Sequence, residues 1–98
     1  MVVQNILPIG SVVQLKDIDM GVLVSGYCSV TEDKPDYTWD YAGFVFPLGY
    51  VGVDSVISFD EDQIERVITY GFQDEEQMRY IAELTEVMKD IDKGRKEA

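Results

Sequence analysis

The groups that could do covalent chemistry in this chain are serine hydroxyls and a single thiol, because the chain contains no histidine. Histidine is the commonest general base and the commonest transition-metal ligand, so no imidazole is present to activate a serine. Cys28 lies in an apolar, strand-like segment without a nearby base, which is typical of a buried and unreactive thiol. These residue types therefore predict no nucleophilic catalysis.

Carboxylates are abundant, and they gather in two short runs. Asp60, Glu61 and Asp62 form the first run, and residues 74–76 form the second. Each run lies where a helix is predicted to begin, and acidic side chains there interact favourably with free backbone N–H groups. The sequence has no EF-hand spacing and no glycine-rich nucleotide-binding pattern. We therefore expect a protein that is not an enzyme and that holds no metal and no cofactor.

An aromatic stretch, YTWDYAGFVFPLGY at residues 37–50, holds six aromatic side chains, whereas the whole chain has six Tyr, four Phe and one Trp. Strand alternation places Tyr37, Trp39 and Tyr41 on one face, and these are candidate partner-binding residues because rings with a polar group are typical of interfaces. The alternative is that this row also belongs to the core. Phe44 and Phe46 fall on the other face and are predicted to lie in the core.

The net charge of −11 comes from 19 acidic and eight basic residues. Phosphate backbones and anionic membranes are bound through Lys and Arg, so we expect neither nucleic acid nor membrane as a partner. A protein with basic patches would be attracted instead, although acidity also keeps small proteins soluble. The chain has one cysteine, no apolar run of about 20 residues and no basic, signal-like start, so we expect a cytoplasmic protein or one exported without a cleaved signal.

The elements that must position these residues begin with strands. Short runs rich in Val, Ile and aromatic residues predict four of them, at residues 11–16, 22–30, 37–46 and 55–59. Residues 31–36, TEDKPD, predict a charged loop, and the Pro and Gly residues of 47–52 interrupt pairing.

Helical signals follow the strands. Asp60 with Gln63 is a capping-box pattern, and apolar residues at helical spacing behind it predict a short helix that ends at Gly71. Asp74 with Gln77 repeats the pattern and predicts a longer helix to about Lys93. We expect one α+β domain over residues 1–98, with a bent antiparallel sheet or small SH3-like barrel of four or five strands at 6–59, helices at 60–93 and a frayed tail at 94–98.

The C-terminal helix carries an apolar stripe that includes Leu84, Met88 and Ile91. Docking on the chain's own sheet is its default role, because a small sheet needs a cover. The helix is longer than a small sheet can cover, so we expect its distal part, around Met88 and Ile91, to be free for a helical partner or a homodimer. Leu84, Met88 and Ile91 are therefore the second set of candidate partner-binding residues.

Three segments resemble a bacterial family, the domain-of-unknown-function family 4176. They are ILPIGSVVQLK at 6–16, YTWDYAGFVFPLGYVG at 37–52 and FDEDQIERVITYGFQDEE at 59–76. The resemblance implies a small cytoplasmic protein of Gram-positive bacteria, encoded beside LXG-domain toxins that the type VII secretion system exports. It implies the role of an accessory targeting factor or chaperone that binds a secreted toxin or its helical targeting proteins, and it supplies no catalytic residue.

Two other functions remain open from the sequence. A small-ligand-binding regulatory barrel would use the aromatic row as a pocket, and an immunity protein would bind the C-terminal domain of a toxin and protect a sensitive cell from it.

Overall fold

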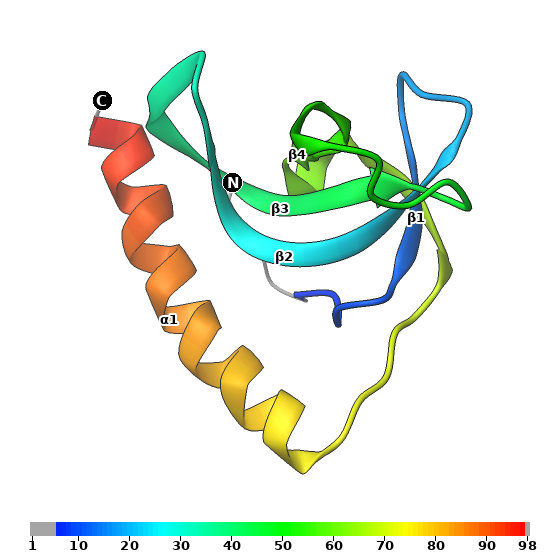
Figure 1. The fold of residues 1–98 in the computed structure, drawn as a ribbon. Helices are drawn as coiled ribbons and strands as arrows, with labels where there is room; N and C mark the ends of the chain where they lie inside the picture. Colours follow the sequence, from blue (N-terminus) through cyan, green and yellow to red (C-terminus); the bar gives the residue numbers. More distant parts are fainter. Residues whose placement is uncertain (1–5, 98) are drawn as a thin grey trace.

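The computed structural model describes residues 6–97, with side chains described as far as Ile91. Five antiparallel strands are followed by one long helix (Figure 1), which confirms the predicted α+β fold. The strands are β1 (Val12–Leu15), β2 (Gly21–Thr31), β3 (Lys34–Val45), β4 (Ile57–Phe59) and β5 (Ile64–Thr69). The helix is α1 (Glu75–Glu97), and two 3-10 turns are η1 (Val53–Ser55) and η2 (Glu61–Gln63). The strand order across the sheet is β4-β3-β2-β1-β5.

The predicted charged loop at residues 31–36 is instead the tip of a hairpin. Thr31 pairs with Lys34, so β2 and β3 are joined by a two-residue turn at Glu32 and Asp33. Asp suits such turns because it tolerates their backbone geometry. Pro35 is accommodated within β3 because β4 pairs only with residues 41–43 of that strand, where no proline lies.

The predicted short helix after Asp60 is wrong, because residues 64–69 form strand β5. The capping box does form: the Gln63 side chain accepts a hydrogen bond from the Asp60 N–H at 2.8 Å, but it closes only the 3-10 turn η2. The β5 strand then pairs with β1 through two register irregularities. These irregularities interrupt the two-residue alternation of buried and exposed side chains along the strand. The half-buried residues of β5 are therefore Ile64 and Val67, three positions apart, which is also the spacing of a helix.

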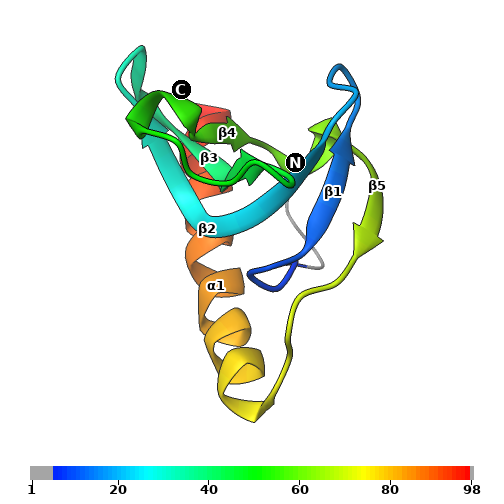
Figure 2. The same cartoon turned by 45° about the vertical axis from the view of Figure 1, so that its right-hand side comes forward.

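The core lies between the sheet and the middle turns of α1 (Figure 2), and the first turns of the helix extend past the sheet. Tyr41 and Phe59 are fully buried, with ring centroids 5.4 Å apart. Leu84 and Met88 are 6% and 4% exposed and pack into the same cluster. The prediction that the helix is free around Met88 is therefore wrong, because the turns of α1 that carry Leu84 and Met88 pack on the sheet.

Helix α1 begins where the sequence predicts. The Gln77 N–H donates to Asp74 Oδ1 at 2.8 Å, so Asp74 caps the first turn. The helix continues to Glu97, beyond the predicted end at Lys93.

The second half of the aromatic stretch is exposed, which also differs from the sequence prediction. Phe46, predicted in the core, is 53% exposed, and Phe44 is half-buried with its ring 5.5 Å from that of Tyr50. The exposure follows from the path of the chain, because β3 ends at Val45 and the connection to β4 leaves the sheet there.

Candidate functional site

The three residues of the predicted aromatic row, Tyr37, Trp39 and Tyr41, differ in burial. Tyr37 and Trp39 are half-buried and meet edge to face with ring centroids 4.8 Å apart. The Lys34 ammonium group lies 5.7 Å and 5.5 Å from these two ring centroids, a cation–π arrangement. Tyr41, however, is fully buried. Only Tyr37 and Trp39 of this row remain available to a partner.

The second predicted set is divided in the same way. Leu84 and Met88 belong to the core, whereas Ile91 is half-buried near the last described side chains of α1.

The Tyr41 hydroxyl is the centre of a buried polar network. It accepts a hydrogen bond from the Leu7 N–H at 3.2 Å and donates one to Glu61 Oε2 at 2.8 Å. The Tyr27 hydroxyl donates to the Leu7 carbonyl at 2.5 Å. A buried hydroxyl is costly unless it is hydrogen-bonded, so these contacts allow the tyrosine ring to lie in the core. They also fix the N-terminal segment, residues 6–8, against the sheet.

The carboxylates of Asp40 and Asp60 anchor the η2 turn to β3. Asp40, 5% exposed, accepts a hydrogen bond from the Glu61 N–H at 2.9 Å. Asp60 accepts one from the Asp40 N–H at 2.9 Å and another from the Tyr37 hydroxyl. These bonds give both carboxylates a structural role. Within the described residues, no three potential metal-ligating side chains are grouped as a metal site would require.

Burial changes the acidity of this network. Burial raises the pKa of Glu61 above its usual range, and the Asp40 charge adds to the increase, although the Tyr41 hydrogen bond lowers it. Burial also raises the pKa of Tyr27 to about 12 and that of Tyr41 further above its ordinary value. Both phenols are thus neutral donors at physiological pH.

A groove of about 530 Å³ opens beside this network. We call it the α1 groove; it is lined by residues from the N-terminal segment, η2, β5 and α1, among them Leu7, Pro8, Glu61, Val67, Tyr70 and Ile81. A second hollow of about 260 Å³ shares Ile6, Gln73 and Ile81 with it and extends along α1 to Met78. Together they form a continuous depression along the uncovered first turns of the helix.

Gly71 holds the two walls of the α1 groove together. Its N–H donates to the buried Ser11 hydroxyl at 3.0 Å, and a Cβ atom at this position would lie 2.1 Å from the Ile9 carbonyl oxygen. Only glycine therefore allows residues 70–72 to approach residues 9–11 this closely.

The rim of the α1 groove and of the adjoining hollow is apolar, and the Glu61 carboxyl group also lines the groove. Tyr70 lines the groove and Met78 lines the hollow, and they are 62% and 61% exposed. No Lys or Arg side chain among residues 6–91 forms an ion pair with the Glu61 carboxylate. The Gln77 side-chain oxygen, in the adjoining hollow, is buried without a hydrogen-bond partner. The groove thus offers apolar contacts together with two acceptors for a cationic or N–H group.

Sequence reasoning missed this site because Tyr70, Gly71 and Phe72 were placed at the end of a helix. The available signal was a glycine between two aromatic residues, which is typical of a close backbone approach.

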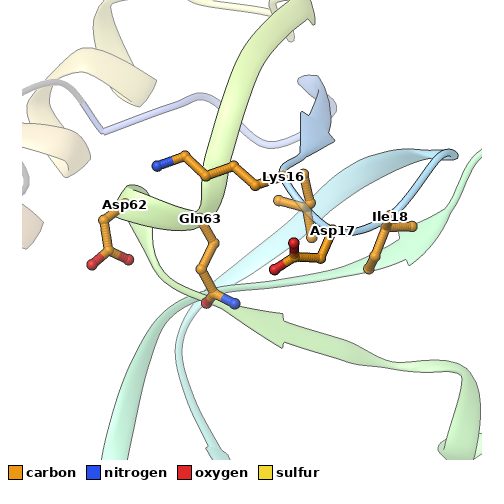
Figure 3. A pocket seen from close by; sticks show the side chains of 6 residues that line it. Lys16, Asp17, Ile18, Asp62 and Gln63 are labelled. Carbon is orange, nitrogen blue, oxygen red and sulfur yellow. The ribbon is translucent and has the colours of Figure 1, made fainter.

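A third hollow lies on another side, between the β1–β2 turn and η2. Its volume is about 240 Å³, and its lining is Leu15, Lys16, Asp17, Ile18, Asp62 and Gln63. In Figure 3, Asp62 and Gln63 lie on one side of it and Asp17 and Ile18 on the other, with Lys16 above. Small-molecule pockets usually measure about 300–1,000 Å³. This hollow therefore gives little support to a small-ligand-binding function.

Comparison with known proteins gives one match. A family described as "Domain of unknown function (DUF4176)" matches residues 6–80, which include the whole sheet and the first turns of α1. No curated protein and no solved structure matches the chain. In the part of the chain that the structure describes, no helix is both long enough and apolar enough to cross a membrane.

Proposed function

Because the chain belongs to the domain-of-unknown-function family DUF4176, we propose that it is a non-enzymatic cytoplasmic accessory protein that binds an LXG-type effector of a Gram-positive type VII secretion system. The secretion context comes from the family resemblance described above. The observation that carries the binding role is the α1 groove, with its exposed apolar rim and a carboxyl group, that of Glu61, which forms no ion pair with a described Lys or Arg.

The apolar rim supports binding to a protein. Tyr70 and Met78 line the concave surface and are 62% and 61% exposed, and aromatic anchors that a partner buries supply much of the energy of protein interfaces. Contiguous exposed apolar side chains around a groove are typical of interaction sites.

The charges indicate what kind of partner is bound. The Glu61 carboxyl group lines the groove without an ion pair to a described Lys or Arg, and the acidic residues 74–76 directly follow Gln73, which also lines the groove. A partner segment with a basic side chain would pair with Glu61, and the net charge of −11 would steer such a partner toward the protein.

Three residues from the sequence prediction remain in this proposal. Tyr37, Trp39 and Ile91 stay predicted contacts because their side chains are only half-buried. Tyr41, Leu84 and Met88 no longer belong to the binding surface, because they form the core.

Co-purification tests the proposal. The tagged chain is produced with an LXG-type effector, and capture is compared for wild type, Tyr70→Ser and the matched control Tyr50→Ser. Tyr70 lines the groove and Tyr50 does not, and they are 62% and 61% exposed, so both variants remove an exposed tyrosine ring. Capture by wild type and Tyr50→Ser, with loss in Tyr70→Ser, is expected; no capture of the effector by wild type would overturn the proposal.

Truncated effectors separate the accessory role from immunity. Capture of the LXG part is expected for an accessory protein, whereas capture of the C-terminal toxin domain alone would identify an immunity protein instead.

A further inference from the structure

We propose that two copies of this chain associate through the β3–β4 connection, residues 46–56. This segment holds six exposed large apolar side chains, each between 41% and 79% exposed. They are Phe46, Leu48, Tyr50, Val51, Val53 and Val56. Single exposed apolar residues need no explanation, but six in one short segment are typical of an interface.

Internal hydrogen bonds hold the connection in a defined shape. The Gly49 N–H donates to the Val45 carbonyl at 2.8 Å, and the Ser55 N–H donates to the Gly52 carbonyl at 3.0 Å. The Ser55 hydroxyl also accepts a hydrogen bond from the Val51 N–H at 3.1 Å. The Tyr50 ring rests edge-on against Phe44, which belongs to the sheet. The apolar side chains are therefore presented by an ordered surface, which lowers the entropy lost on association.

The charge distribution favours a second copy of this chain as the partner that binds the connection. Asp54 is the only charged residue between positions 41 and 59, in a chain of net charge −11. Two copies of so acidic a protein repel each other over most of their surface, and this segment is where they can approach with the least repulsion. A basic partner, in contrast, gains nothing from a neutral surface and is attracted to the acidic α1 groove.

The size of the patch agrees with a dimer. A standard interface buries about 800 Å² on each partner. Two aromatic rings, a leucine and three valines, about half to four-fifths exposed, supply a large part of that area. A two-fold axis through the connection would bring the same patch together from both copies, as isologous interfaces do.

The dimer would leave the α1 groove accessible. In both Figure 1 and Figure 2 the connection and the first turns of α1 lie at opposite ends of the molecule. The α1 stripe, from which the sequence predicts a homodimer, is instead occupied at Leu84 and Met88 by the chain's own core. The inference is independent of the partner proposed above.

Sedimentation velocity of the purified full chain over a wide concentration range tests this inference. Wild type is expected to reach the mass of a dimer. Leu48→Asp is expected to raise the dissociation constant about a hundredfold or more, because it buries an unpaired carboxylate in the interface. The control Phe72→Asp adds the same charge at another exposed apolar site, outside the connection, and it is expected to remain dimeric. Thermal unfolding checks that each variant is folded, and Val53→Asp replaces Leu48→Asp if the latter unfolds.

Three results would overturn the inference. The first is a wild type that is monomeric at the highest concentration. The second is a dimer that persists in both Leu48→Asp and Val53→Asp, and the third is a dimer that is lost in Phe72→Asp alone. A monomeric wild type whose effector capture is lost in Leu48→Asp would assign the connection to the effector instead, and one that floats with lipid vesicles would assign it to a membrane.

Discussion

The two ends of the aromatic stretch, residues 37–41 and 46–50, differ in burial in a way that the polarity of their side chains does not predict. Tyr41 carries a hydroxyl and is fully buried, whereas Phe46 and Leu48 carry no polar atom and are 53% and 65% exposed. The difference comes from partners supplied by distant segments. Leu7 and Glu61 satisfy the Tyr41 hydroxyl in the core, while nothing among residues 6–91 covers the connection.

The largest expected effect is on the buried end. Tyr41→Ala removes a fully buried ring and leaves Glu61 and the Leu7 N–H without their partner, so it should lower the free energy of unfolding by about 3–5 kcal/mol. Tyr50→Ala, at a ring that is 61% exposed, should change it by about 0.5 kcal/mol or less. Urea denaturation at low protein concentration measures both, and equal losses for the two variants would contradict the comparison.

The same contrast applies to neighbouring residues of α1, with a smaller effect. Met88 is 4% exposed and Val87 is 49% exposed. Met88→Ala should lower the free energy of unfolding by about 2–5 kcal/mol, because it opens a cavity between helix and sheet. Val87→Ala should have little effect, since alanine is also the better helix former. A small loss for Met88→Ala would show that the distal part of α1 does not cover the core.

The smallest expected effect concerns Glu61 and appears only as a pH dependence. Because its folded-state pKa is raised, chiefly by burial, the unfolded chain releases this proton first as the pH rises. The free energy of unfolding should therefore fall from the ordinary carboxyl range up through the raised pKa. Glu61→Gln keeps an acceptor for Tyr41 and removes the titration, so its stability relative to wild type should increase from acidic to neutral pH. Denaturation across that range measures the difference, and a constant difference would contradict a raised pKa.

Local patterns were sufficient to predict the four strands before Asp60 and the start of α1. Alternating apolar residues mark β2 and β3, and the Asp74 cap forms as its spacing indicates. The strand β5 was missed because bulged pairing with β1 hides its two-residue period.

The α1 groove could not be predicted for a different reason. Leu7, Glu61 and Ile81 are far apart in sequence, and only the close approach at Gly71 and the hydrogen bonds of Tyr41 bring their segments together. Strand alternation placed Tyr41 on the same face as Trp39 but could not show that this face is the core, because that depends on where α1 packs.

The central claim is that partner binding is concentrated in the α1 groove. Calorimetric titration of a purified LXG-type effector into wild type, Tyr70→Ser and Leu48→Ser tests it most directly. The account predicts an affinity at least about tenfold weaker for Tyr70→Ser and unchanged for Leu48→Ser, because Tyr70 lines the groove and Leu48 lies in the β3–β4 connection. Equal affinities for wild type and Tyr70→Ser, or a loss confined to Leu48→Ser, would contradict it.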